Sequence, residues 1–346
     1  MGSIRLAFDG YMERRLPSVT TLDLTETQRL SICRKFGGSS LAYFSATQPD
    51  LLHFGDQNGY IAFARKMGHV FVLGDPVAAP EHRLALLRRF IEQSGDPCFV
   101  QIGVETARML SALGFRVNRM GVETILPLTE TMFAGTRNQS IRYSEKWLIQ
   151  RGYQLSEVLE GDASAEEAIR ISEEWRSARI VSRREMRFLN RPFLPVPGPD
   201  MRRFVLRDPE GRIAALLDFD PVYAEDRITG YTTAFKRKRH GTTPHAEIAL
   251  TKFAADRFRS ERIGFITLGL SPLAAIDQSG FGESALWRIL FDKAYHSRRV
   301  NDRIFNLQGQ AAFKRRFHGE EVPCYMAFRS ASPLRMLALL RLLKTL

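Results

Sequence analysis

Four consecutive cations at positions 236–239 stand between a strand-like segment and the start of a helix near His245. The unpaired N–H groups at a helix N-terminus, with cations beside them, form a site for an anion such as phosphate. The same run of charges is also compatible with a solvated surface. The candidate phosphate ligands of this segment are Lys236, Arg237, Arg239 and Gly241.

Other common catalytic patterns are absent from the sequence. It has no Gly-x-Ser-x-Gly nucleophile motif, and Asp218, Asp220 and Asp226 lack the spacing of a metal-binding loop. The three cysteines are widely separated in a chain of 346 residues. They exclude a disulfide scaffold and indicate a reducing compartment. We therefore expect no metal and no bound cofactor.

The charge balance indicates a polyanionic partner. Lysine and arginine outnumber aspartate and glutamate by 50 to 38, which gives a net charge of +12. Such a surplus favours nucleic acid, anionic lipid or a phosphorylated molecule. No apolar run approaches the ~20 residues of a membrane span, and the N-terminus lacks a signal-peptide pattern. We expect a cytoplasmic protein.

The order of elements in the second half is typical of an acyl-CoA N-acetyltransferase (GNAT-like) fold. A tight turn joins two strands, a third strand leads into a basic loop at 236–244, and a helix and a strand follow. The expected strands are 203–207, 213–219, 228–235, 265–270 and 323–329, and the expected helices are 166–179, 245–259 and 283–297.

The first half repeats this order more weakly. Its expected strands are 60–66, 69–73 and 98–104, and its expected helices are 81–93, 106–113 and 139–150. We therefore predict an α/β protein with two tandem GNAT-like domains, each a mixed sheet flanked by helices. The predicted divisions are an N-terminal extension (1–20), a first domain (21–150), a second domain with the transfer site (151–331) and a C-terminal helix (332–346).

A coenzyme A site on this fold needs a loop of the form Arg/Gln-x-x-Gly-x-Gly/Ala around the pyrophosphate. Residues 238–243 read KRHGTT, with one glycine and a β-branched threonine at the last small position. A residue with a side chain at that position disfavours close backbone approach to a pyrophosphate. The segment counts against coenzyme A and leaves a phosphate-bearing polymer or lipid as the ligand.

The C-terminal segment 333–346, PLRMLALLRLLKTL, predicts a short amphipathic helix. Arg335, Arg341 and Lys344 fall on one half of its helical wheel. Such a helix either docks on the core or lies in an anionic membrane leaflet. The second alternative would place the protein peripherally on the inner face of the cell membrane.

A longer motif lies near the C-terminus, where residues 304–317 read IFNLQGQAAFKRRF. Three shorter stretches accompany it: residues 37–44 with Phe54, the turn VLGDP at 72–76, and LGLSPL at 268–273. Together they resemble the catalytic domain of the phosphatidylglycerol lysyl/alanyltransferase family, the aminoacyl-phosphatidylglycerol synthases. The four stretches resemble its Asn-Phe-Gln-Gly…Phe-Lys block, its opening strand region, its Gly-Asp-Pro turn and its Leu-Gly-x-x-Pro-Leu strand end.

This resemblance implies a tandem GNAT-like fold whose donor is aminoacyl-tRNA in place of acyl-CoA. It implies transfer of the aminoacyl group to a hydroxyl of phosphatidylglycerol or of a related acceptor. The implied partners are aminoacyl-tRNA, as co-substrate, and an anionic phospholipid at the membrane surface. The sequence resembles a stand-alone form of the domain, without the flippase region that precedes it in most members.

The resemblance and the chemistry of ester transfer together assign candidate roles. The attacking hydroxyl must lose a proton, and the oxyanion must be stabilised. Lys314 matches the family's Phe-Lys motif and is the first candidate for an oxyanion or phosphate contact, with an exposed helix lysine as the alternative. Glu247 and His245 are candidates for the base. Asn306 and Gln308 either orient the ester or cap the following helix.

Charge and aromatic character add further candidates. Arg315 and Arg316 extend the positive charge of the C-terminal motif. Tyr231 and Trp175 are candidates for stacking on the terminal adenine of tRNA or, alternatively, for the apolar core.

One position departs from the family pattern. The family's Asp-x-x-Arg pair corresponds by spacing to Thr233 and Lys236, so the acidic residue is absent here. This absence keeps open an acyltransferase that uses acyl-CoA or another acyl carrier on a lipid or small molecule. A third alternative is a non-catalytic module that binds membranes or RNA through its positive surface.

Overall fold

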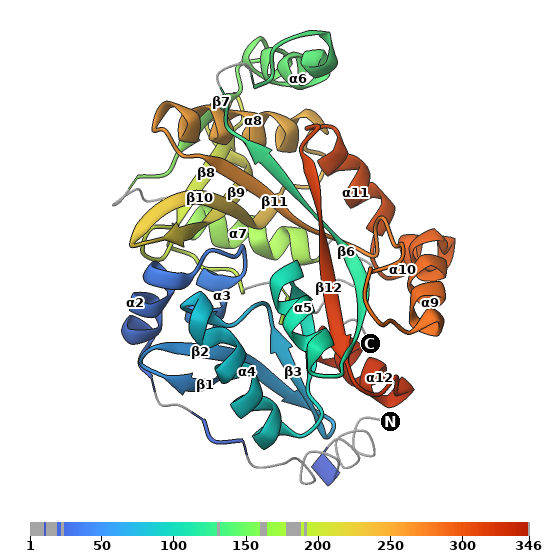
Figure 1. Ribbon diagram of the computed structural model, residues 1–346. Helices are drawn as coiled ribbons and strands as arrows, with labels where there is room; N and C mark the ends of the chain where they lie inside the picture. Colours follow the sequence, from blue (N-terminus) through green and yellow to red (C-terminus); the bar gives the residue numbers. More distant parts are fainter. Residues whose placement is uncertain are drawn as a thin grey trace.

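The computed structural model describes residues 10–11, 19–21, 24–129, 132–159, 165–177, 188–189 and 192–344. Within this part of the chain, twelve strands form one mixed sheet with helices packed against it (Figure 1). Most of the predicted N-terminal extension, 1–20, lies outside the described residues. No helix in the described ranges is long and apolar enough to cross a bilayer.

The first half of the chain builds one end of the sheet and confirms the predicted strands and helices to within a few residues. Its first helix begins with a capping box formed by Thr25 and Gln28. The elements are α2 (Glu26–Phe36), α3 (Ala42–Thr47), β1 (Leu52–Asp56), β2 (Gly59–Lys66), β3 (His69–Leu73), β4 (Val77–Ala78), α4 (Pro80–Ser94), β5 (Cys98–Ile102), α5 (Val104–Ala112) and β6 (Arg116–Pro127).

The second half follows a short 3₁₀ turn (Thr136–Asn138) and helix α6 (Gln139–Ile149). Its predicted elements are also present, although the end of the expected helix 166–179 lies outside the described residues. The elements are β7 (Gln154–Glu157), α7 (Ala165–Ser177), β8 (Arg202–Arg207), β9 (Ile213–Ala224), β10 (Arg227–Lys238), α8 (His245–Ser260), β11 (Phe265–Pro272), α9 (Ala285–His296), α10 (Arg298–Arg303), α11 (Leu307–Arg315), β12 (Glu320–Phe328) and α12 (Pro333–Leu342).

The two halves are joined by an exchange of their last strands. The sheet order is β1-β2-β3-β5-β12-β6-β11-β10-β9-β8-β7, with β4 beside β2. Each half has antiparallel strands followed by one parallel pair, β3 with β5 and β10 with β11. Strand β6 then pairs with β11 of the second half, and β12 pairs with β5 of the first. Each predicted domain (21–150 and 151–331) therefore contributes one strand that pairs within the other domain.

Two expectations about local structure are wrong. Of the segment 37–44, expected in an opening strand region, the last three residues belong to the buried helix α3 (Ala42–Thr47). The basic segment, expected to be a loop from residue 236, continues β10 as far as Lys238 because residues 236–238 remain paired with β9. The basic loop is therefore shorter than predicted, and its first cations are strand residues.

The apolar core of the second half lies between α8 and strands β8 to β10. Its aromatic centre is formed by Phe204, Phe219 and Phe258, whose rings pack edge to face. Tyr231 is 4% exposed and stacks on Phe258 with ring centroids 4.3 Å apart. Tyr231 thus belongs to the core, and its ring face is not presented to a tRNA base.

Candidate active site

The parallel strands β10 and β11 stop pairing after Thr232 and Thr267, and we call the region beyond this point the β10–β11 opening. They pair from Gly230 with Phe265 to Thr232 with Thr267, although both strands continue further. Beyond Thr267 the register of β11 against β6 shifts, and Gly269 takes a φ of 71°. Glycine adopts this φ without steric cost. The resulting β-bulge leaves Leu268 and Gly269 without a partner residue in β6, and pairing resumes at Leu270.

Lys314 reaches this opening from helix α11. Its ammonium donates to the carbonyl oxygen of Gly269 at 2.9 Å and to that of Leu270 at 2.6 Å. The residue is only 9% exposed, so it is not the exposed helix lysine that the sequence left as an alternative. Burial, and secondarily the charge of Lys236, lower the pKa of Lys314 to about 7. An amine with this pKa exchanges a proton near neutral pH.

Three further sequence candidates lie around Lys314. The ammonium of Lys236 lies 4.2 Å from the ring centroid of Phe313 and 3.5 Å from a carboxylate oxygen of Glu247. Thr233 lies next to the bulge of β11, since a Cβ built on the bulge glycine would come 3.7 Å from its hydroxyl oxygen. The opening therefore unites residues of β10, α8 and α11 that are far apart in the sequence.

Glu123 is a member of this site that the sequence did not reveal. It comes from the exchanged strand β6, and its carboxylate accepts a hydrogen bond from the Thr267 hydroxyl at 2.8 Å. That hydroxyl oxygen accepts the N–H of Gly269 at 3.0 Å, and the Gly269 carbonyl accepts Lys314. Burial raises the pKa of Glu123, against the opposing effect of the hydrogen bond from Ser40.

The first half contains a corresponding position, which we call the β3–β5 opening, where β3 ends beside β5. These strands pair in parallel up to Leu73 with Val100, and a bulge follows at Gln101, whose φ is 57°. In this opening Asp75, from the Gly-Asp-Pro turn, accepts the N–H of Gly103 at 3.0 Å. Burial raises the pKa of the Asp75 carboxyl group. The carboxylate thus binds the backbone at the start of α5.

The four cations at 236–239 do not form one anion site. Consecutive side chains of a strand point to opposite faces, so Lys236 faces α8 while Arg237 faces α7. Arg237 is 8% exposed, and its guanidinium lies 3.6 Å from the ring centroid of Trp175. Arg239 extends toward Glu167 of the same helix, at 3.3 Å. Trp175 therefore packs on Arg237, and Arg239 lies among carboxylates.

Two candidates from the start of α8 lie away from Lys314. A ring nitrogen of His245 lies 3.0 Å from the Ser144 hydroxyl, and its ring packs on Trp147 of α6 with centroids 4.9 Å apart. His245 therefore faces α6. Gly241 has a φ of 76°, and a Cβ there would meet no atom within 4 Å, so it shapes an open turn.

The Asn-Leu-Gln-Gly block fixes the start of helix α11. The Asn306 side chain accepts the N–H of Gly309 at 2.8 Å, as a helix cap does. A Cβ on Gly309 would lie 2.4 Å from the Asn306 amide nitrogen, so a larger residue there would displace the capping side chain. Gln308 donates to the carbonyl of Tyr295 at 3.2 Å. The structure thus supports the capping alternative for Asn306 and gives Gln308 an anchoring contact.

The end of α11 is positively charged at its exposed positions. Arg315 donates to Glu321 at 2.8 Å, and both Arg315 and Arg316 are exposed. The helix therefore holds one buried lysine in the opening and two arginines at the surface.

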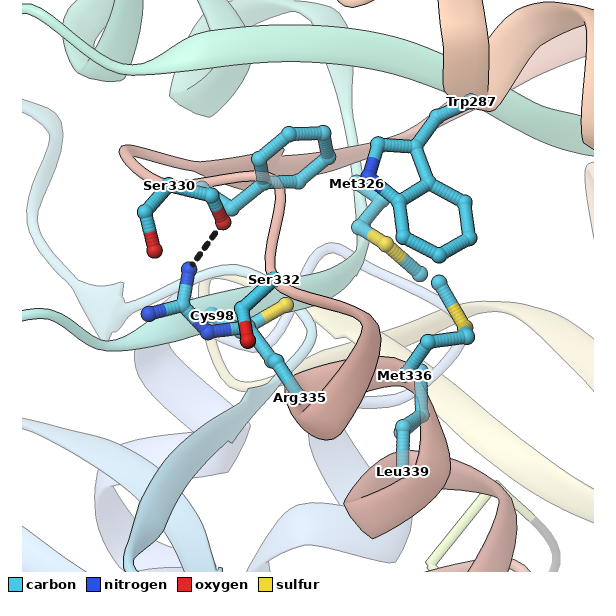
Figure 2. Close-up of a pocket in the computed structure, with 9 residues that line it drawn as sticks. Cys98, Trp287, Met326, Ser330, Ser332, Arg335, Met336 and Leu339 are labelled. Carbon is cyan, nitrogen blue, oxygen red and sulfur yellow. Dashed lines mark hydrogen bonds between the residues drawn. The ribbon is translucent and has the colours of Figure 1, made fainter.

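The C-terminal helix α12 is docked on the body of the protein. Arg335 is 6% exposed, donates to the Ser330 carbonyl at 2.7 Å and pairs with Asp96. Figure 2 shows Arg335 turned toward Ser330 beside a small pocket that Trp287 and Met336 line. This contradicts the expectation that Arg335 contributes to a face of the helix that binds an anionic leaflet.

The groups in the opening are of types that can exchange protons and bind an oxyanion. No group of three or more His, Cys, Asp or Glu that could hold a metal ion occurs among the described residues. The charged groups around Lys314 are Lys236, Glu123 and Glu247. Such groups can polarise an ester carbonyl and stabilise the charge that develops on its oxygen.

The mixed sheet flanked by helices is the α/β architecture that the sequence predicts. The sequence profile of the family "phosphatidylglycerol lysyltransferase, C-terminal" matches residues 31–328. The chain belongs to this family, as the resemblance of its four motifs predicts.

Solved structures share the fold. The structure of L-PGS from Bacillus licheniformis has a TM-score of 0.75 and 19% identity, and the match covers 94% of this chain and 99% of that one. The C-terminal domain of a putative lysylphosphatidylglycerol synthetase from Agrobacterium fabrum has a TM-score of 0.77 and 20% identity, with 92% and 96% covered.

A curated relative is a longer protein. An uncharacterized protein of Corynebacterium glutamicum is 22% identical over 315 residues, which cover 86% of this chain. The chain spans 38% of the length of that relative.

Proposed function

We propose that this protein transfers an aminoacyl group from aminoacyl-tRNA to a hydroxyl of phosphatidylglycerol or of a related acceptor. The observation that carries the proposal is Lys314, a buried amine with a pKa of about 7 in the β10–β11 opening. Membership of a family described as phosphatidylglycerol lysyltransferases supports the acceptor. The donor is the one that the family resemblance implies, and an aminoacyl ester of tRNA is already activated for transfer.

Lys314 is proposed to stabilise the oxyanion. An ammonium group has three N–H donors. Two of them bind the carbonyl groups of Gly269 and Leu270, which leaves one for the ester carbonyl of the substrate. As the acceptor hydroxyl adds to this carbonyl, its oxygen becomes an anion and a stronger hydrogen-bond acceptor. Loss of one such donor typically lowers kcat by about 10²–10³-fold.

Glu247 is the proposed base. Its carboxylate is held beside Lys236 at the edge of the same opening. The acceptor oxygen bonds to the ester carbon and gives its proton to Glu247. The bond from that carbon to the tRNA ribose oxygen then breaks, and the proton passes to this leaving oxygen. The step is balanced and needs no further reactant.

Charged groups near the opening suit the two substrates. Arg315 and Arg316 are exposed on the helix that carries Lys314, as expected of contacts to the phosphates of a tRNA 3′ end or of a lipid. Thr233 cannot supply the negative charge of the family's acidic residue. We infer that Glu123, which reaches the same bulge from β6, supplies a carboxylate in its place.

Labelled aminoacyl-tRNAs incubated with the protein and phosphatidylglycerol vesicles test the proposal. We expect a chloroform-soluble aminoacyl product from at least one tRNA, and its loss in Lys314→Ala. Lys35→Ala, at an exposed position of α2, is the matched control and keeps activity. The absence of product from every tRNA contradicts the proposal. Saturable coenzyme A binding in calorimetry would then favour an acyl-CoA donor, and strongly salt-dependent tRNA binding a non-catalytic module.

A further inference from the structure

Helices α9 and α10 present an apolar and basic surface that the transfer chemistry does not use. It consists of the exposed residues Leu286, Ile289, Leu290, Lys293, Arg298, Arg299, Arg303 and Ile304, which we call the α9–α10 face. Figure 1 shows the two helices at the outer side of β6, next to α11. From this surface we propose that the α9–α10 face docks on an anionic phospholipid bilayer.

The two sides of α9 have different partners. Trp287 and Phe291 are 8% and 6% exposed and face inward, and Figure 2 shows Trp287 beside the methionines of the pocket. Leu286, Ile289 and Leu290 are 59%, 48% and 42% exposed. At about 100° per residue these three share one stripe, away from the buried pair. The helix is therefore apolar on both sides, and only one side is covered by the protein.

The exposed apolar residues are concentrated here. Ile304 at the end of α10 is also exposed, at 39%. Four large apolar side chains thus lie at the surface within residues 286–304. Such a cluster marks an interaction site, whereas single exposed apolar residues need no explanation.

The charges of the face select the partner. The same two helices have four exposed cations, Lys293 of α9 and three arginines of α10, and two exposed acids, Asp292 and Asp302. A helix with an apolar side and a cationic border is typical of binding in the interface of an anionic membrane. Each such cation contributes about fivefold to binding at an anionic leaflet.

The position of the face fits an enzyme with a lipid substrate. This part of the inference rests on the proposed function. Helix α11, which carries Lys314, packs against both α9 and α10. Docking through these helices would bring the membrane surface to the side of the sheet from which Lys314 enters. The C-terminal helix α12 does not offer an equivalent surface, because its Arg335 is buried.

Flotation of the full chain with lipid vesicles, without tRNA, tests the proposal. We expect binding to mixed phosphatidylglycerol–phosphatidylcholine vesicles and much weaker binding to phosphatidylcholine alone. The double variant Leu286→Ser/Ile289→Ser should lower the fraction bound by at least about tenfold. The double variant Arg298→Gln/Arg299→Gln should lower affinity by about 25-fold, and less at high salt.

The matched controls replace exposed apolar and cationic side chains outside the α9–α10 face. Leu334→Ser on α12 and Ile149→Ser on α6 replace side chains that are 49% and 60% exposed, and Arg88→Gln/Arg262→Gln removes two exposed cations. All should bind as the unchanged protein does. The proposal is overturned if the face variants keep full binding, if the controls lose as much, or if the protein binds both vesicle types equally weakly.

An activity measurement separates this inference from the proposed function. With phosphatidylglycerol in detergent micelles, the face variants should retain activity, because no membrane is needed there. With vesicles their activity should fall together with binding. If the unchanged protein forms no product in either system but still floats with anionic vesicles, the proposed function fails and the docking surface stands. If the protein makes product from micelles and does not float, the docking surface fails alone.

Discussion

The two openings of the sheet share a geometry and differ in the charge they contain. In each half the parallel pairing ends beside a bulge with a positive φ, at Gln101 in β5 and at Gly269 in β11. The first opening contains the carboxylate of Asp75, and the second contains the ammonium of Lys314. Both groups are buried. Burial raises the pKa of Asp75 and lowers that of Lys314, so in each case it favours the neutral form.

The difference lies in what remains for a ligand. Asp75 is occupied by the backbone of its own chain at the start of α5. Lys314 gives two donors to β11 and keeps a third. Asp75 therefore has a structural contact, whereas Lys314 keeps an N–H for the substrate carbonyl that we propose it binds. The strand exchange links them, because Glu123 of β6 reaches the second opening from the first half of the chain.

Replacing Lys314 gives the largest expected effect. Lys314→Met keeps the length of the side chain and removes the charge, so transfer should fall about 10²–10³-fold. The folded protein should become more stable, because burial of the ammonium lowers its pKa to about 7 from 10.5. This cost is complete below pH 7 and diminishes as the pH rises toward 10.5. We therefore expect a Tm increase of about 3 °C at pH 6 and a smaller one at pH 9.

The control is Lys35→Met on α2, which should change neither quantity. If the Lys314→Met protein loses stability and keeps activity, Lys314 is a structural residue and not the oxyanion donor.

Replacing Asp75 should lower the stability of the protein and leave its activity nearly unchanged. Asp75→Ala leaves the N–H of Gly103 without its acceptor, which typically costs about 1–3 kcal/mol of unfolding free energy. The value of kcat should stay within about threefold, because no substrate contact is lost. Urea unfolding and steady-state kinetics measure the two effects, and Asp277→Ala, at an exposed position, is the control. A large fall in kcat at unchanged stability would make the first opening a second reactive site.

Much of the fold could be predicted from the sequence because local patterns dictate it. Alternating apolar residues, the turn at 208–211 and glycines after helices fixed most elements to within a few residues. The strand exchange could not be predicted, since it depends on pairings between distant segments. Strand β6 was missed because Asn118 and Glu123 interrupt its apolar pattern.

The site residue that belongs to a recognisable motif could be predicted. The residues that distant segments bring together could not. The motif containing Lys314 identified the buried amine, whereas Asn306 and Gly309 in the same motif serve the helix start. The tetrad at 236–239 was misread as one loop, because the strand continues and alternates its side chains. Glu123 lies opposite Leu270, within the LGLSPL motif, only through the exchange of β6, which the sequence does not reveal.

The pH dependence of transfer distinguishes the roles of Lys314. If its ammonium stabilises the oxyanion, kcat/KM falls as the pH rises through about 7, where the amine loses its proton. Lys314→Arg keeps a charged donor throughout this range, so its lower activity should show no such fall. Rates measured between about pH 6 and pH 9 check this expectation. A rise of kcat/KM through pH 7 would instead make the neutral amine the base.

The smallest expected effect concerns the link between the two halves. The negative charge of Glu123 raises the pKa of Lys314, so Glu123→Gln should move the falling limb of the pH profile to lower pH by less than about one unit. Thr267→Val removes only the hydroxyl that joins Glu123 to the bulge, so it should lower kcat and leave the limb in place. A pH limb that does not move in Glu123→Gln would leave Glu123 a purely structural residue. The first half would then contribute to the geometry of the site but not to the pKa of Lys314. The two effects are separable because the charge of Glu123 acts through space, whereas the Thr267 hydroxyl acts only through the geometry of the bulge.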